Sequence, residues 1–143
     1  MKKRILTMSL ALLMIVALAF TATGCGTGGA KAVVKDFFKA IDDHDVKKFI
    51  NCFDKDLRED LNDEKEFLKD LLEEIDDMFE DEFGKKWFKE LKIGDVEKDD
   101  TDDGVTYYTV EIELDGEEEE IAVKKVKGKF YIDEETMSDL AGF

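Results

Sequence analysis

The sequence predicts an α+β domain in which N-terminal helices pack on an antiparallel β-meander, preceded by a signal peptide. Three observations predict it. Apolar residues recur at helical spacing before Gly84, and they alternate with polar residues after it. At the N-terminus an apolar run follows three basic residues. The length of 143 residues is that of one domain, which we expect to span residues 30–143.

The composition indicates a folded, acidic protein. Hydrophobic residues make up 43% of the chain and charged residues 41%, which is enough apolar material for a core. The formal net charge of −16 excludes a basic nucleic-acid binder, because affinity for the phosphate backbone depends on positive charge. We therefore expect no nucleic-acid partner.

The N-terminus carries the layout of a secretory signal: Lys2, Lys3 and Arg4, then the apolar residues 5–20, then small residues. The apolar stretch is shorter than the roughly 20 residues that a membrane-spanning helix needs. The following Ala22-Thr23-Gly24-Cys25 resembles the lipobox of bacterial lipoproteins, with Ala22 where leucine is usual.

This resemblance implies that residues 1–24 are a lipoprotein signal peptide and that Cys25 carries the lipid. Residues 25–29 would form a short Gly-rich tether, and the domain would be held on the outer face of the cell membrane. The membrane is then a partner through the lipid on Cys25. The alternative is an ordinary secretory signal cleaved earlier, which would leave Cys25 free to pair with Cys52.

Helical periodicity predicts three helices. The first spans about residues 30–42, and its Lys31, Lys35 and Lys39 share one face that could lie against an anionic membrane surface. The alternative is that these lysines form the solvated face of an amphipathic helix. A short second helix follows the N-cap residue Asp45, and a long third helix runs from a capping signal at Asp63 to Gly84.

After Gly84 the pattern predicts four strands. Trp87 lies on the inner side of the first strand, which ends in a polar turn over residues 99–104. The second strand alternates up to the turn Asp115-Gly116, and residues 118–126 and 129–133 form two more strands about Lys127-Gly128.

Three segments carry a resemblance to nuclear-transport-factor-two-like domains: the opening helix of residues 32–41, the acidic turn after it, and the closing residues 126–132. The resemblance, which also covers SnoaL-like proteins and small Gram-positive lipoproteins of uncharacterised function, implies a cystatin-like α+β fold. Helices would pack into the concave face of a curved antiparallel sheet and form a cone with an apolar pocket. That superfamily includes isomerases, dehydratases, ligand binders and interaction modules, so it implies a fold more firmly than a function.

Few residues could carry chemistry. His44 is the only histidine, and no Gly-x-Ser-x-Gly motif surrounds Ser138. A Cys52–His44 pair would lack an orienting third group. Zinc lacks ligands, and the calcium-loop-like residues 99–104 are followed by Val110 where a bidentate glutamate is required. We expect no enzyme activity, no metal and no cofactor.

The aromatic residues of the strands are the remaining candidates for a site. Trp87, Tyr108, Phe130 and Tyr131 could line a small apolar pocket, although aromatic residues at strand spacing more often form ordinary core. We therefore expect a non-enzymatic binding or interaction module that uses an acidic surface or a small apolar pocket for a protein or an apolar ligand. The alternative is a pocket enzyme, an acid–base isomerase or dehydratase, which would require a buried carboxyl group with a raised pKa.

Overall fold

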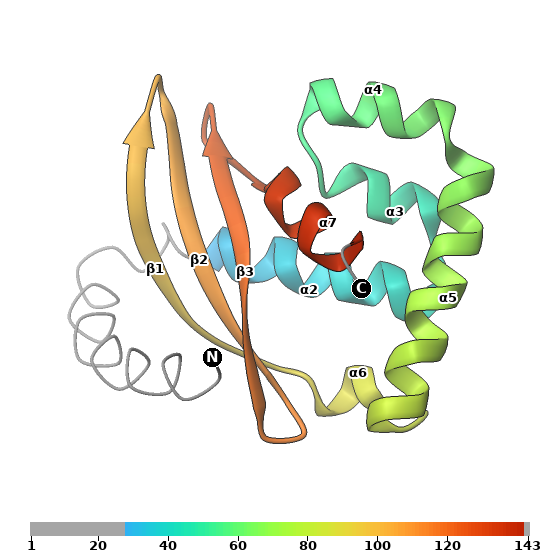
Figure 1. Ribbon diagram of the computed structural model, residues 1–143. Coiled ribbons are helices and arrows are strands. Elements are labelled where there is room, and N and C mark those ends of the chain that lie inside the picture. Colours follow the sequence, from blue (N-terminus) through green and yellow to red (C-terminus); the bar gives the residue numbers. More distant parts are fainter. Residues whose placement is uncertain (1–27, 142–143) are drawn as a thin grey trace.

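A computed structural model describes residues 28–141, which form an α+β fold of helices followed by an antiparallel sheet (Figure 1). The predicted signal peptide, Cys25 and the first part of the tether lie outside the described residues. The helices are α2 (Gly28–Asp43), α3 (Val46–Asn51), α4 (Lys55–Asp63), α5 (Lys65–Phe83), α6 (Trp87–Glu90) and α7 (Glu134–Ala141), and the strands are β1 (Lys92–Asp102), β2 (Val105–Leu114), β3 (Glu117–Val126) and β4 (Lys129–Ile132). No helix within residues 28–141 combines the length and the apolar character needed to cross a bilayer.

The sheet is the predicted meander, with four strands in the order β1-β2-β3-β4 and every neighbouring pair antiparallel. Its three connections are Asp103-Gly104, Asp115-Gly116 and Lys127-Gly128, and both residues of each have positive φ angles. Two-residue turns of this kind match the twist of the strands that they join, and glycine adopts a positive φ without a steric penalty. The sheet does not close, because β1 and β4 form its two edges.

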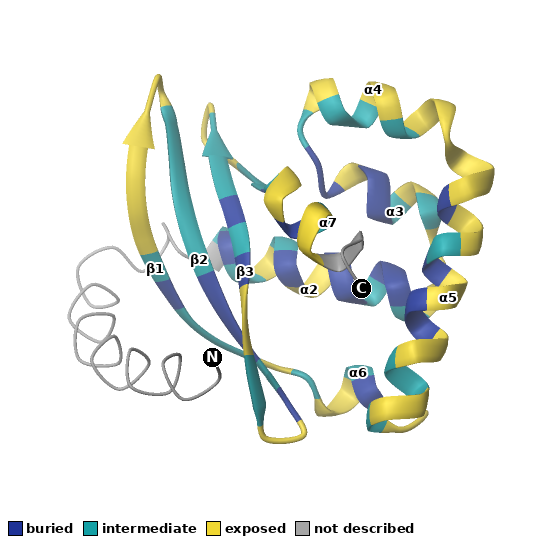
Figure 2. Ribbon diagram, in the orientation of Figure 1, coloured by how far each residue is buried: buried dark blue, intermediate teal, exposed yellow. Residues whose placement is uncertain are grey.

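The core lies between one face of the sheet and the helices, which Figure 1 shows on the same side of the strands. In α2 the buried Val34, Phe37 and Ile41 follow the expected helical spacing, and in β2 Val110, Ile112 and Leu114 alternate with more polar residues. Figure 2 shows these buried segments facing one another, while the outer surfaces of α4 and α5 are exposed.

Four predicted details were wrong. Trp87 begins the short helix α6 and not a strand, and β1 starts only at Lys92. Two residues that are four positions apart, such as Trp87 and Leu91, lie on the same side of a strand and also on the same side of a helix. The pattern therefore did not distinguish a helix from a strand here. The polar turn expected over residues 99–104 shrinks to Asp103-Gly104, because β1 continues to Asp102. Asp63 ends α4 and does not cap α5, which starts after Glu64 without a side-chain cap.

Besides α6, two more helices were not predicted, α4 and α7. The helix α4 has no buried residue, and only Leu57 and Leu61 pack partly against the core. The helix α7 follows the last strand and is fixed by Thr136, whose hydroxyl group accepts a hydrogen bond from the Ala122 N–H at 3.1 Å and donates to the Ala122 carbonyl at 3.2 Å. Among the side chains that the structure describes, the apolar residues that these helices pack against the core are the partly buried Leu57 and Leu61 of α4 and Met137 of α7, too few for periodicity to reveal them.

A buried carboxylate connects three of the helical segments. Asp76 of α5 is 5% exposed, and its Oδ1 accepts a hydrogen bond from the indole N–H of Trp87 at 2.7 Å. Its Oδ2 lies 2.7 Å from Nε2 of His44, in the turn between α2 and α3. The Trp87 ring itself is fully buried and packs on Phe79 with ring centroids 4.7 Å apart. Asp76 therefore joins α5 to α6 and to the α2–α3 turn.

The acidic end of α2 lies beside this carboxylate. Partial burial, followed by the negative charges of Asp76 and Asp43, raises the pKa of Asp42 above its ordinary value of 3.8. Asp42 and Asp43 also occupy the last turn of α2, where the helix dipole disfavours negative charge. The negative charges at the end of α2 therefore destabilise the folded state.

We predict that Asp76→Ala destabilises the domain by about 2–4 kcal/mol, because it leaves the buried Trp87 N–H without an acceptor. Urea unfolding of the full chain measures this loss. The matched control is Asp77→Ala, which removes the same side chain from the next, exposed position of α5 and should change stability by less than about 0.5 kcal/mol. Equal losses in the two variants would contradict the role of Asp76.

We predict that Asp42→Asn stabilises the protein at pH 7 by about 0.5 kcal/mol, because it removes charge from a helix C-terminus. The pKa of Asp42 is raised in the fold, so the folded state binds this proton more tightly than the unfolded chain does. The stabilisation of Asp42→Asn over the wild type should therefore be fully present at a pH above the raised pKa. It should decrease as the pH falls through that pKa, and it should be absent below pH 3.8, where Asp42 is protonated in both the folded and the unfolded state. Thermal unfolding at pH 7 and at pH 3 tests both parts, with the exposed Asp70→Asn as the control for net charge.

Candidate functional site

A groove of about 550 Å³ lies where the first turns of α2, the end of α3 and the edge strand β4 meet. Residues of four elements and of the segment after α3 line it: Gly29, Ala32, Val33 and Asp36 of α2, Lys48 and Asn51 of α3, Cys52, Arg58 of α4, and Lys129, Phe130 and Tyr131 of β4. It includes two of the four aromatic residues that the sequence suggested for a pocket. We take it as the candidate site.

Backbone contacts fix the inner wall of the groove. The side chain of Asp45 accepts a hydrogen bond from the Lys48 N–H at 3.0 Å and caps α3 as predicted. At the other end of α3 the Cys52 carbonyl accepts a hydrogen bond from the Ile132 N–H at 2.8 Å. This bond joins the end of α3 to the outer edge of β4.

A glycine lets α2 approach β4 closely. A Cβ atom at Gly29 would overlap the ring of Phe130, so a side chain at this position would force the ring to shift. The ring of Phe130 also packs on Tyr108, with centroids 5.5 Å apart, and Nζ of Lys125 lies 5.1 Å from its centroid. Phe130 is therefore held in place at the mouth of the groove.

The charge of the groove differs from that of the chain. Lys48, Arg58 and Lys129 line it against a single carboxylate, Asp36, although the chain carries a formal net charge of −16. An arginine side chain can bind a phosphate or carboxylate group through two parallel hydrogen bonds. Together with the aromatic wall, this lining suits a ligand with an anionic group and an apolar part.

Cys52 contributes a thiol of low reactivity. It is 3% exposed, and its thiol group donates a hydrogen bond to the Lys48 carbonyl at 3.3 Å. Burial and, to a lesser degree, the charge of Asp36 raise its pKa from 9.0 to about 12. His44, by contrast, interacts with Asp76. The two residues that a cysteine–histidine pair would need thus have different partners.

The predicted aromatic set is divided in the structure. Tyr108 and Phe130 are in contact, and Phe130 and Tyr131 line the groove. Trp87 lies apart from them in α6, inside an aromatic cluster with Phe38, Phe79 and Phe88. Its indole N–H is already used by Asp76.

The three lysines expected to face the membrane lie along α2 in different surroundings. Lys35 is exposed and lines a hollow of about 410 Å³ with Phe88, Lys89, Leu91 and Ile93. Lys39 forms an ion pair with Asp43 at 3.2 Å and lies over the Phe88 ring. Lys31 is half-buried near the start of the helix. Of the three, Lys35 is the most exposed to solvent.

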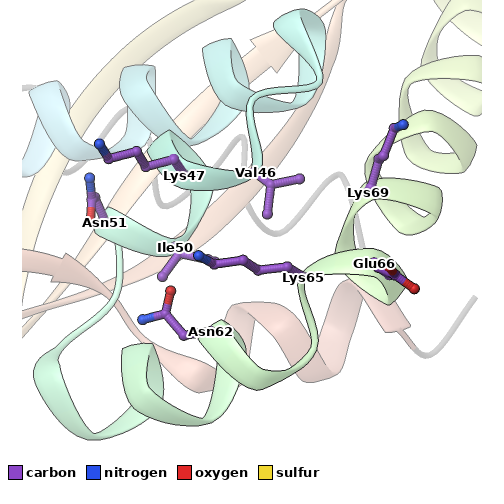
Figure 3. A pocket seen from close by; sticks show the side chains of 8 residues that line it. All are labelled: Val46, Lys47, Ile50, Asn51, Asn62, Lys65, Glu66 and Lys69. Carbon is purple, nitrogen blue, oxygen red and sulfur yellow. The ribbon is translucent and has the colours of Figure 1, made fainter.

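A second hollow, of about 580 Å³, lies between α3, α4 and α5 (Figure 3). It has a floor of Val46 and Ile50 and is bordered by polar side chains: Lys47, Asn51, Asn62, Lys65, Glu66 and Lys69. Figure 3 shows the Lys65 side chain extending towards Ile50 and Asn62, while Lys69 points away. This hollow contains neither an aromatic ring nor arginine, and its lysines provide useful control positions for the groove.

Some of the acidic residues lie on the opposite face of the sheet. The pairing of β2 with β3 places Glu111 opposite Glu120 and Glu113 opposite Glu118. Burial, followed by the charges of Asp99 and Glu97, raises the pKa of Glu120. Within residues 28–141 no group of three or more His, Cys, Asp or Glu side chains is placed to hold a metal ion. This face is acidic, but Glu111 is buried and Glu113 lies 3.8 Å from Lys92, so only part of its charge reaches the surface.

Sequence reasoning missed most of the polar side of the groove. Lys48, Arg58 and Lys129 are distant in sequence and follow no motif, and only the fold brings them to one groove. Arg58 was noticeable as the only arginine after Arg4. The buried Asp76 was also missed, because an aspartate within a helix gives no sign of its burial.

Comparisons with known proteins found no relative with which this site could be compared. No family model matches the chain, and neither the search of curated proteins nor the search of solved structures found a match.

Proposed function

We propose that the protein is a membrane-anchored extracytoplasmic lipoprotein that binds, without catalysis, a small ligand with an anionic group and an apolar part. One observation carries the binding half of this proposal: a groove with an aromatic wall and three cationic side chains against one carboxylate, in a strongly acidic chain. The basic start, the apolar run and the lipobox-like residues 22–25 support the anchor.

The proposal includes the nuclear-transport-factor-two-like cone. Two observations support it. The helices lie on one side of an antiparallel meander, and α2 starts beside β4 and extends into the helical layer. The groove at the edge of this arrangement takes the place of the central apolar pocket that the resemblance implies.

A binding module suits the residues of the groove better than a pocket enzyme does. An acid–base enzyme requires a carboxyl group or a histidine that is shielded from water and able to reach its ligand. The carboxylate that lines the groove, Asp36, is exposed, and the buried Asp76 is paired with Trp87 and His44 away from it. We therefore assign the groove to recognition.

We predict that the full chain, expressed in a Gram-positive host, is labelled by a fatty-acid analogue and recovered with the membranes. The Cys25→Ser variant should lose both the label and the membrane association, because stable anchoring depends on the buried acyl chains. Label that persists in Cys25→Ser, or a wild-type chain without label, would refute the anchor.

We predict that full chain purified from its membranes in mild detergent retains a ligand of roughly a few hundred daltons, observed by native mass spectrometry. Arg58→Gln should lower its occupancy at least about 10-fold, since one charge-assisted contact contributes about 1.5–3 kcal/mol. Lys65→Gln, in the hollow between α3, α4 and α5, should leave it unchanged. Absence of any ligand from the wild type, or equal occupancy in both variants, would refute binding in the groove.

A further inference from the structure

The groove lies at the end of the domain nearest to the expected lipid. The helix α2 begins at Gly28, so only residues 26 and 27 separate it from Cys25. Three Cα–Cα steps span at most about 11 Å. If Cys25 carries a lipid, as proposed above, the start of α2 must lie within about that distance of the membrane surface.

Three of the four residues that α2 contributes to the groove belong to its first turns, and the fourth, Asp36, follows them. Gly29, Ala32 and Val33 lie within five residues of its start, which corresponds to about 8 Å along the helix axis. Phe130 of β4 lies directly against Gly29. The aromatic wall is therefore held beside the end of the helix that the lipid would attach to the bilayer.

The lining of the groove complements the surface of an anionic bilayer. Lys48, Arg58 and Lys129 can bind a phosphodiester group, and Val33 and Phe130 can contact the apolar region next to it. Anionic lipids would repel the acidic remainder of the domain, including the exposed carboxylates of α5. This repulsion would favour an orientation in which the groove faces the bilayer.

We propose that this groove binds the phosphate head group of an anionic phospholipid in the membrane that anchors the protein. This inference rests on the proposed function and names its ligand. The tether and the groove then act on the same surface: the lipid on Cys25 brings the groove to the bilayer, and the bound head group fixes the orientation of the domain.

The test uses the full chain in a non-ionic detergent, titrated with dihexanoyl-phosphatidylglycerol below its micelle concentration and followed by native mass spectrometry. We expect saturable binding of one lipid molecule. Dihexanoyl-phosphatidylcholine should bind at least about 5-fold more weakly, because its choline group adds a positive charge beside Lys48, Arg58 and Lys129.

Three variants assign the binding to the groove. Arg58→Gln and Lys129→Gln should each weaken phosphatidylglycerol binding about 10-fold, as expected for the loss of a charge-assisted contact. Lys65→Gln removes one positive charge from the other hollow and should leave the affinity unchanged. Arg58 is half-buried and Lys129 is exposed, so a loss of folding in one variant, detected by circular dichroism, leaves the other as the test.

Each other outcome has a definite meaning. Equal affinity for phosphatidylglycerol in all three variants overturns the lipid assignment. Inorganic phosphate that competes at the same concentration as the lipid also overturns it, because the apolar part would then contribute nothing. A retained ligand that is not a phospholipid would refute this inference and leave the proposed function standing, whereas an empty groove in both experiments would refute both.

Discussion

The buried carboxylate of Asp76 is the constraint from which much of the helical layer follows. A carboxylate in an apolar interior must be paired, and the two available donors come from the α2–α3 turn and from the indole of Trp87. Trp87 can supply its N–H only if the chain after Gly84 turns back towards α5. That geometry makes α6 a helical turn, and it delays the start of β1 until Lys92.

The regular half of the fold could be predicted from the sequence because its signals are local. Alternation in β2, the pairs Asp115-Gly116 and Lys127-Gly128, and the helical spacing in α2 each lie within one segment. Trp87 was placed wrongly because its partner, Asp76, lies 11 positions earlier in another element. The helices α4 and α7 escaped notice because they add little apolar surface to the core.

The candidate site was predictable only in its aromatic half. Phe130 and Tyr131 stood out as aromatic residues in a terminal strand, whereas Lys48 lies on α3 and Arg58 on α4. A backbone hydrogen bond from Ile132 to Cys52 and an ion pair between Lys124 and Asp54 join these helical segments to the sheet. Contacts between segments that are distant in the chain leave no local pattern of residue types, so they cannot be predicted from the sequence alone. The result is a molecule with a cationic groove at one edge and an acidic sheet face, a separation of charge that the net value of −16 conceals.

The contact between Gly29 and Phe130 also bears on the order of folding. The hairpins of the sheet each close a loop of two residues, whereas this contact joins positions about 100 residues apart. Because the entropy cost of closure grows with loop length, the hairpins can form early, and the contact of α2 with the last strand forms later. A chain that stops before β4 would therefore leave the start of α2 without the strand that it packs on, and such a fragment would be a target for proteolysis rather than a smaller working domain.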